Sequence, residues 1–333
     1  MNSSHKTDQA QQAWQATSPR DCGLVYSKGI AMGLGDSVPG VSGGTIAVIT
    51  GIYETLIHSI CRVDLVLLRL VLSGQWRQGW RHCNGTFLLL LLIGILSGLL
   101  LSARTVLFLL DNYFAPLMSF FIGLVLASTW LLRTELNWRH PGNLIAVLLG
   151  ILLTSGVGLL EAGSGEPSLI YLLFCGAVAI SAMILPGLSG AFILLLLGAY
   201  ETMLQALLGL ELLRIAVFFS GCIFGLLAFS RLLDWLLSNW HQRSYGFICG
   251  LLLGSLSVLW PWQQPLSFYT DSDGVQQVLR SQNVSPLDYE QLSGQPPLLL
   301  ISLVAVAAGI ALVLGLHRSF RNSDQAGSAR GKV

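Results

Sequence analysis

Two stretches of the chain, PGVSGGTIAVITGIYET at 39–55 and PGLSGAFILLLLGAYET at 186–202, are copies of one another. Nine of their seventeen positions are identical at an offset of 147 residues. Further identities follow each copy at an offset of 127, among them Gly94 with Gly221 and Gly123 with Gly250. A long, regular offset of this kind indicates an internal duplication. The sequence therefore predicts two repeats, and the drop of 20 in the offset places an insertion within 58–86 of the first.

The composition is that of a membrane protein. Of 333 residues, 53% are hydrophobic and only 11% are charged, whereas soluble domains carry about 25% charged residues. Apolar runs recur that are long enough to cross ~30 Å of hydrocarbon. Three follow each motif, at 87–110, 115–132 and 142–160 in the first repeat and at 214–237, 245–262 and 297–316 in the second.

Positive charge predicts the topology. If each motif segment returns to its own side of the membrane, fourteen Lys and Arg residues face the cytoplasm and two face outward, as the positive-inside rule requires. A single crossing would divide the same sixteen charges equally. The charge distribution therefore favours a motif segment that returns to its own side. With a returning segment, each repeat makes an odd number of net crossings, so the second repeat is inverted relative to the first. Both termini are predicted to be cytoplasmic, as are 58–86 and 238–244, and 161–168 and 263–296 are predicted to face outward.

The predicted fold class is an all-α polytopic membrane protein with two inverted-topology repeats. Each repeat consists of a helical hairpin, either re-entrant or doubly spanning, and three transmembrane helices. Interrupted helices that meet near mid-bilayer in inverted repeats are typical of secondary transporters. The boundaries are a polar tail at 1–23 without signal-peptide features, repeats at 24–160 and 169–317 (with the loop 263–296 inside the second), and a tail at 318–333.

The hairpin tips have the residue types of an anion site. Proline and glycine, at Pro39, Gly40, Pro186 and Gly187, stop the incoming half-helix. The outgoing half-helix begins with good N-cap residues and small residues whose amides remain available, and such helix ends bind anions. The candidate anion-binding residues are Ser42, Gly43, Gly44, Thr45, Ser189 and Gly190. The structural alternative is that proline and glycine only kink packed helices.

Charged side chains within the apolar segments are further candidates. Arg104 and Arg231 occupy equivalent repeat positions, and two guanidinium groups suit a phosphate. Their alternative role is to extend to opposite membrane interfaces. Asp36, just before the first tip, is a candidate for proton coupling or for a structural ion pair. Glu54 and Glu201 are candidates for gating or proton binding, with interfacial hydrogen bonding as the alternative.

Other kinds of site are not predicted. The six cysteines and six histidines lack the spacing of metal ligands or of a redox pair. No metal, cofactor or nucleic-acid partner is therefore expected, and a homo-oligomer remains open.

The doubled motif, GDSVPGVSGGTIAVITGIYETLI with ISAMILPGLSGAFILLLLGAYETML, resembles the bacterial polyprenyl-phosphate translocases over about residues 24 to 317. The resemblance implies a transporter that recycles undecaprenyl phosphate across the cytoplasmic membrane for cell-envelope polysaccharide synthesis, with Pro39 to Thr45 and Pro186 to Gly190 as the matching positions. One alternative is an undecaprenyl-pyrophosphate phosphatase, but Gly43 and Gly190 stand where its motif carries arginine. A small-anion channel or exchanger is the other alternative.

Overall fold

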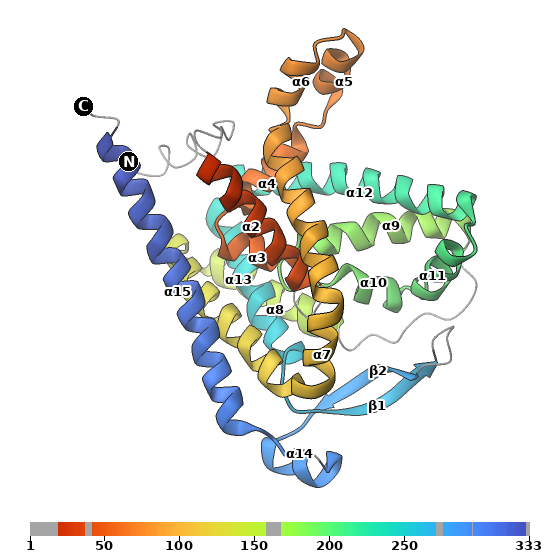
Figure 1. Cartoon of the computed structure of the whole chain (residues 1–333), viewed down its shortest axis with the longest axis vertical. Helices are drawn as coiled ribbons and strands as arrows, with labels where there is room; N and C mark the ends of the chain where they lie inside the picture. The colour runs from red at the N-terminus through yellow and green to blue at the C-terminus, as the bar shows by residue number, and fades with distance from the viewer. Residues whose placement is uncertain (1–18, 37–41, 158–167, 271–275, 295, 331–333) are drawn as a thin grey trace.

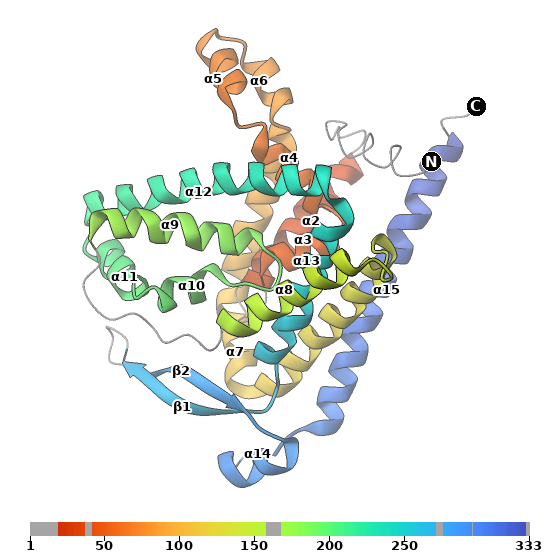
Figure 2. The same ribbon diagram turned by 180° about the vertical axis from the view of Figure 1, so that it is seen from behind.

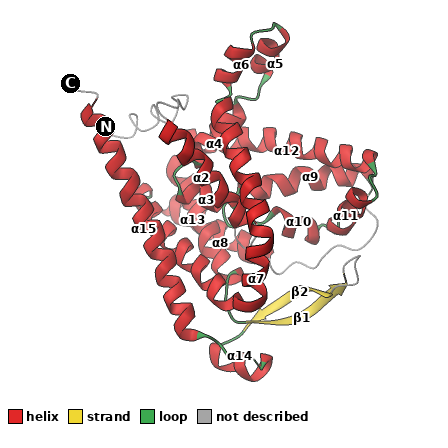
Figure 3. Ribbon diagram, in the orientation of Figure 1, coloured by secondary structure: helices red, strands yellow, loops and turns green. Residues whose placement is uncertain are grey.

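The computed structural model describes residues 19–36, 42–157, 168–270, 276–294 and 296–330 (Figure 1). Helices dominate the described residues, as Figure 3 shows. Three helices are long and apolar enough to cross a membrane, namely Gly85–Ser102, Asn112–Glu135 and Leu212–Asn239, and shorter apolar helices accompany them. The prediction of a mainly helical, multi-pass membrane protein is confirmed.

Each motif segment forms three helices. In the first repeat these are α2 (Pro19–Asp36), α3 (Gly43–Ile49) and α4 (Tyr53–Cys61), and in the second α9 (Leu169–Ile184), α10 (Gly190–Leu196) and α11 (Tyr200–Leu208). The chain turns by 117° between α3 and α4. The seven residues of α3 extend only about 10 Å, at 1.5 Å per residue, so this helix cannot cross the bilayer alone.

The break after each short helix is made by a repeated glycine. Gly51 has φ +70° and Gly198 has φ +65°, a left-handed conformation that glycine adopts without steric strain. The two positions are equivalent under the offset of 147. Both copies of the motif therefore carry glycine at this position because the backbone there has a positive φ.

The apolar segments form the longer helices. In the first repeat, α7 (Gly85–Leu132) is followed by the 3-10 turn η1 (Arg133–Glu135) and α8 (Pro141–Val157). Helix α7 is kinked at Tyr113 (φ −138°, ψ 41°), three residues before Pro116, because proline removes one helical hydrogen bond and clashes with the preceding turn. In the second repeat the helices are α12 (Leu212–Asn239), α13 (His241–Val258) and α15 (Leu299–Arg330), the last continuing beyond the predicted boundary at 317.

Glycines bring these helices into backbone contact in matching pairs. A Cβ on Gly94 would lie 2.4 Å from the Tyr26 carbonyl oxygen of α2, and one on the equivalent Gly221 would lie 2.0 Å from the Leu173 carbonyl oxygen of α9. Small residues permit such close helix packing within a membrane. Helix α2 therefore packs on the first part of α7 as α9 packs on α12, side by side in Figures 1 and 2.

The remaining long helices pair between repeats. A Cβ on Gly123 of α7 would lie 2.2 Å from the Val306 carbonyl oxygen of α15, and one on the equivalent Gly250 of α13 would lie 2.1 Å from the Val147 carbonyl oxygen of α8. Each repeat thus packs one helix against the last helix of the other. The largest buried apolar cluster contains residues of both repeats, including Ile57, Phe87, Met118 and Leu251.

The all-α expectation omitted a small sheet. Strands β1 (Gln263–Thr270) and β2 (Gln276–Asn283) pair antiparallel, with a register shift after Pro265, where proline lacks the amide needed for a regular ladder. Helix α14 (Pro286–Ser293) follows. This sheet lies within the predicted loop 263–296, where a polar composition concealed the alternation of short strands.

The insertion in the first repeat is a helical hairpin of α5 (Leu65–Leu72) and α6 (Trp76–His82). It projects beyond the other helices at the start of α7, at the end of the molecule opposite the β1–β2 sheet (Figures 1 and 2). None of the residues of α5 is buried, and Gly79 is the only buried residue of α6.

Candidate functional site

The two hairpin tips contact each other. The Ser42 hydroxyl donates a hydrogen bond of 3.1 Å to the Leu185 carbonyl oxygen, and the Gly187 amide donates one of 2.9 Å to Thr45 Oγ1. A Cβ on Gly44 would lie 2.5 Å from the Ile184 carbonyl oxygen. Irregular backbone within a membrane must be satisfied by protein or by water. Side chains of the first tip supply partners for the irregular backbone of the second.

The first outgoing helix is capped by a carboxylate. Asp36, at the end of α2, accepts a hydrogen bond of 2.5 Å from the Gly43 amide. The Ser42 side chain was expected to cap α3, but it does not, because its hydroxyl is directed to Leu185. An anionic side chain therefore already occupies the amide end of this helix, where the helix dipole favours negative charge.

The second outgoing helix is capped by its own serine. Ser189 Oγ accepts a bond of 3.4 Å from the Phe192 amide, as predicted for this position. Met183 takes the place of Asp36, with its Cβ 3.3 Å from the position of a Cβ on Gly190. The two helix ends thus differ in charge although their motifs match.

The two tips also differ in exposure. Ser42, Gly43, Gly44 and Thr45 are buried, whereas Ser189 and Gly190 are half-buried. Pro186 and Gly187 are buried against α13, where a Cβ on Gly187 would lie 2.8 Å from the Leu251 carbonyl oxygen. Among the described residues of the two motif tips, the partly accessible ones therefore lie at the start of α10.

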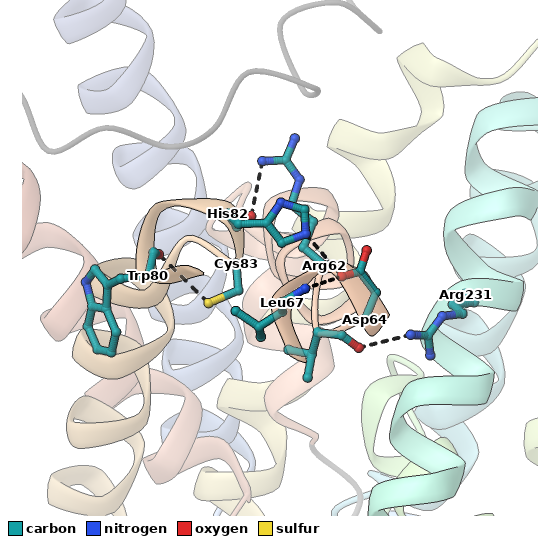
Figure 4. Close-up of polar contacts among 8 residues, drawn as sticks. Arg62, Asp64, Leu67, Trp80, His82, Cys83 and Arg231 are labelled. Carbon is teal, nitrogen blue, oxygen red and sulfur yellow. Dashed lines mark hydrogen bonds and ion pairs between the residues drawn. The ribbon is translucent and has the colours of Figure 1, made fainter. Parts of the chain in front are cut away.

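Arg231 lies away from the hydrogen bonds that join the tips. Its side chain is exposed and donates to the Leu227 carbonyl oxygen of its own helix at 2.8 Å and to the Val63 carbonyl oxygen at 2.9 Å. Figure 4 shows this contact at the base of the α5–α6 hairpin. In the conformation described, the Arg231 guanidinium fastens α12 to the end of α4.

Glu54 belongs to a polar cluster that joins the repeats. The Tyr245 hydroxyl of α13 donates a bond of 2.5 Å to Glu54 Oε1. His241 lies between two carboxylates, with Nδ1 3.9 Å from Glu54 Oε1 and Nε2 3.7 Å from Glu135 Oε2. One turn further along α4, His58 Nδ1 lies 3.5 Å from Asp234 Oδ1 of α12. Helix α4 is therefore attached to α12 and α13 by polar contacts.

The sequence did not single out the partners in this cluster. Tyr245 and His241 are 191 and 187 residues from Glu54, and nothing in a single sequence pairs positions so far apart.

Four predicted site residues are not fully among the described residues. Pro39 and Gly40 lie outside them altogether. Arg104 and Glu201 have described backbones, in α7 and α11, but their side chains are not described. Within the described residues, no group of three or more His, Cys, Asp or Glu side chains could hold a metal ion.

Comparison with known proteins identifies relatives of this chain. Residues 32–277 match a family model described as VCA0040-like, undecaprenyl phosphate translocase-like. A protein of Vibrio cholerae serotype O1 named polyprenyl-phosphate transporter is 43% identical over 295 residues, which are 88% of this chain and 96% of the relative. A Staphylococcus aureus protein of the same name is 34% identical over 255 residues, 70% of this chain and 84% of the relative. No solved structure matches.

Proposed function

Because the chain belongs to the undecaprenyl phosphate translocase-like family, we propose that it returns undecaprenyl phosphate from the outer to the inner leaflet of the bacterial cytoplasmic membrane. The protein is a transporter of polyprenyl phosphate and not an enzyme. The observation that carries the proposal is the hydrogen-bonded contact between two broken helices, Ser42 with Leu185 and Thr45 with Gly187. A returned carrier lipid would support cell-envelope polysaccharide synthesis.

The two repeats are proposed to have opposite membrane orientations. The support is the charge distribution of the loops together with the matched pairs α2–α7 and α9–α12 and the exchanged pairs α7–α15 and α8–α13. In this arrangement the α3 and α10 hairpins are re-entrant and enter from opposite faces. Inverted repeats with interrupted helices suit a transporter, because exchange of the two repeat conformations exposes one central site to each side in turn.

The phosphate head is proposed to bind at the paired tips. A phosphate monoester carries roughly −1.5 to −2 charges near neutral pH and needs several donors. The half-buried start of α10, with Ser189 and Gly190, is the point of entry. Gly43, Gly44 and the hydroxyls of Ser42 and Thr45 complete the site when the tip contact loosens.

Asp36 is proposed to control access to the first tip. Its carboxylate holds the Gly43 amide, so a dianionic phosphate must displace it or meet it in protonated form. Glu54 and Glu201 are proposed as gating groups at the far ends of the two motifs. Arg104 and Arg231 are proposed to assist the phosphate as it approaches from opposite sides, with Arg231 first releasing Val63.

Liposomes containing the purified protein provide the test. Undecaprenyl phosphate placed in one leaflet should equilibrate faster than in empty liposomes, and no inorganic phosphate should appear from undecaprenyl pyrophosphate. Gly43 and Gly190 stand where the phosphatase motif carries arginine, so neither motif supplies the guanidinium that would stabilise phosphoryl transfer. Chloride flux without lipid movement would contradict the proposal and favour an anion channel.

Cells provide the second arm of the test. Impermeant thiol labelling of single cysteines should reach 263–296 but not 58–86 from outside, since the latter is proposed to be cytoplasmic. Depletion in cells without a redundant carrier should leave undecaprenyl phosphate on the outer leaflet, where an antibiotic that binds the phosphate head detects it. Labelling at position 77 in intact cells would overturn the orientation.

A further inference from the structure

The α5–α6 hairpin carries apolar side chains that the other described residues leave uncovered. Leu65 is 80% exposed, Leu72 78% and Trp76 67%. The hairpin packs mainly on itself, with Gly79 against the side chains of Leu67 and Val71. Contiguous exposed apolar surface on a defined element indicates contact with a membrane or a partner.

The same hairpin is strongly basic. Arg69, Arg77 and Arg81 are exposed, and within the described part of the chain no acidic side chain pairs with them. The one acidic residue of the hairpin, Asp64, caps α5 through the Leu67 amide at 2.9 Å and lies 3.2 Å from His82 Nε2. Burial acts to raise the pKa of Asp64, but bonds from the Leu67 amide and His82 outweigh it and hold the pKa below its usual value. The one carboxylate of the hairpin is thus partnered by the Leu67 amide and His82, and the three arginines keep their positive charge uncompensated by it.

The base of the hairpin is held in place by several contacts. Arg231 donates to the Val63 carbonyl oxygen, and Arg62 donates to the His82 carbonyl oxygen at 3.3 Å, both shown in Figure 4. Trp80 Nε1 donates to Thr86 Oγ1 at 2.9 Å. The first candidate span begins at Gly85, directly after the hairpin, so the hairpin lies at the level where that span leaves the hydrocarbon.

We propose that the α5–α6 hairpin binds anionic lipid head groups at the membrane surface, with its leucines and tryptophans in the interface and its arginines on the phosphates. Tryptophan is favoured at the membrane–water boundary. A basic, apolar helical element lies in that plane and binds more strongly to anionic lipid. Charge complementarity favours the lipid surface over a second copy of the chain, whose identical hairpin would repel it. The proposal does not depend on which lipid is transported.

An environment-sensitive fluorophore tests the proposal. Leu72→Cys carries the dye on a background without the six native cysteines, in nanodiscs of phosphatidylcholine alone or mixed with phosphatidylglycerol. Leu287→Cys in α14 is the matched control, because Leu287 is 77% exposed and helix α14 lies at the opposite end of the molecule from the α5–α6 hairpin (Figure 1). Emission from position 72 should shift to the blue when phosphatidylglycerol is present and shift back at high salt, whereas emission from position 287 should not change.

A charge variant separates head-group binding from simple insertion. The triple variant Arg69→Gln, Arg77→Gln, Arg81→Gln should need a larger fraction of phosphatidylglycerol for the same shift, since each arginine near an anionic surface contributes about a fivefold gain in affinity. Identical spectra in both lipid mixtures would overturn the proposal. Formation of a disulfide-linked dimer by unlabelled Leu72→Cys would overturn it as well, and would assign the surface to contact between copies.

Discussion

Asp36 is the residue at which the two copies of the motif differ in charge. Its carboxylate accepts the Gly43 amide, whereas the equivalent Met183 offers no acceptor to Gly190. A helix amide can serve a carboxylate or a phosphate, but not both at once. The first tip therefore carries a built-in competitor for the proposed ligand and the second does not.

Two substitutions of Asp36 distinguish its role as a hydrogen-bond cap of α3 from the effect of its negative charge on phosphate binding. Asp36→Asn keeps an oxygen acceptor for Gly43, so the protein should unfold at nearly the same temperature and bind undecaprenyl phosphate more tightly. Asp36→Ala removes the cap and should lower the free energy of unfolding by about 1 kcal/mol. Thermal unfolding in detergent and native mass spectrometry with the lipid measure the two effects. Met183→Ala is the control, and weaker binding by Asp36→Asn would contradict the competition.

Tyr245 is predicted to hold α4 against α13. Tyr245→Phe leaves Glu54 without its hydroxyl donor, and loss of a hydrogen bond to a charged group costs about 2 kcal/mol. Hydrogen exchange of the α4 amides should therefore become faster. Tyr171→Phe is the comparison, because the Tyr171 hydroxyl bonds a neutral carbonyl, Leu197, at 2.9 Å. Equal protection of α4 in both variants would show that Glu54 does not fasten the helix.

At the scale of elements, glycines determine how closely the half-helices approach. Gly44 lies where a Cβ would be 2.5 Å from the Ile184 carbonyl oxygen, so any side chain there must push the tips apart. Gly156 in α8 is a contrasting glycine, because among the described residues no atom outside its own stretch of helix lies within 4 Å of the position of its Cβ. The two positions separate a steric effect from an effect on helix propensity.

Gly44→Ala is predicted to strain the tip contact by about 2 kcal/mol, a typical cost of overpacking, and to abolish lipid transport in liposomes. Gly156→Ala should be neutral or slightly stabilising, because alanine is the better helix former. The measurements are transport rate and thermal unfolding of the two purified variants. Full transport by Gly44→Ala would mean that the tips need not approach so closely.

The helices and their order could be predicted from the sequence because apolar length and Pro-Gly breaks are local signals. The kink of α7 at Tyr113 falls between the predicted segments 87–110 and 115–132, three residues before Pro116. The break after the short helix of each motif was not predicted, although the identical glycines Gly51 and Gly198 indicated it.

Strands β1 and β2 were not predicted, because alternation within a polar segment is a weak pattern. Neither the Asp36 cap nor the Glu54–Tyr245 bond could be predicted, because both depend on tertiary placement.

At the scale of the whole molecule, the described conformation is asymmetric. Helix α4 packs on α12, but the corresponding helices α11 and α7 lie apart in both views (Figures 1 and 2). If the repeats exchange conformations during transport, α11 should dock on α7 in the alternate state, and α4 should leave α12.

Two cysteine pairs test this exchange. His58→Cys with Asp234→Cys should crosslink with a short reagent in the described state, since their side chains lie 3.5 Å apart. The repeat-equivalent positions, Gln205→Cys with Leu107→Cys, should crosslink only in the alternate state. Each crosslink should stop transport and prevent the other. Simultaneous formation of both crosslinks in one molecule would contradict alternating exchange.

The exchanged helix pairs also determine the order in which the chain can assemble during synthesis. Helix α7 approaches its partner α15 most closely at Gly123 and Gly309, and α15 leaves the ribosome long after α7. Helix α8 must likewise await α13. The amino-terminal half therefore enters the bilayer with two glycine-lined helix faces unpaired, and lipid or the insertion machinery must cover them meanwhile. A nascent chain arrested before residue 299 lacks α15, so the face of α7 around Gly123 stays without its helix partner.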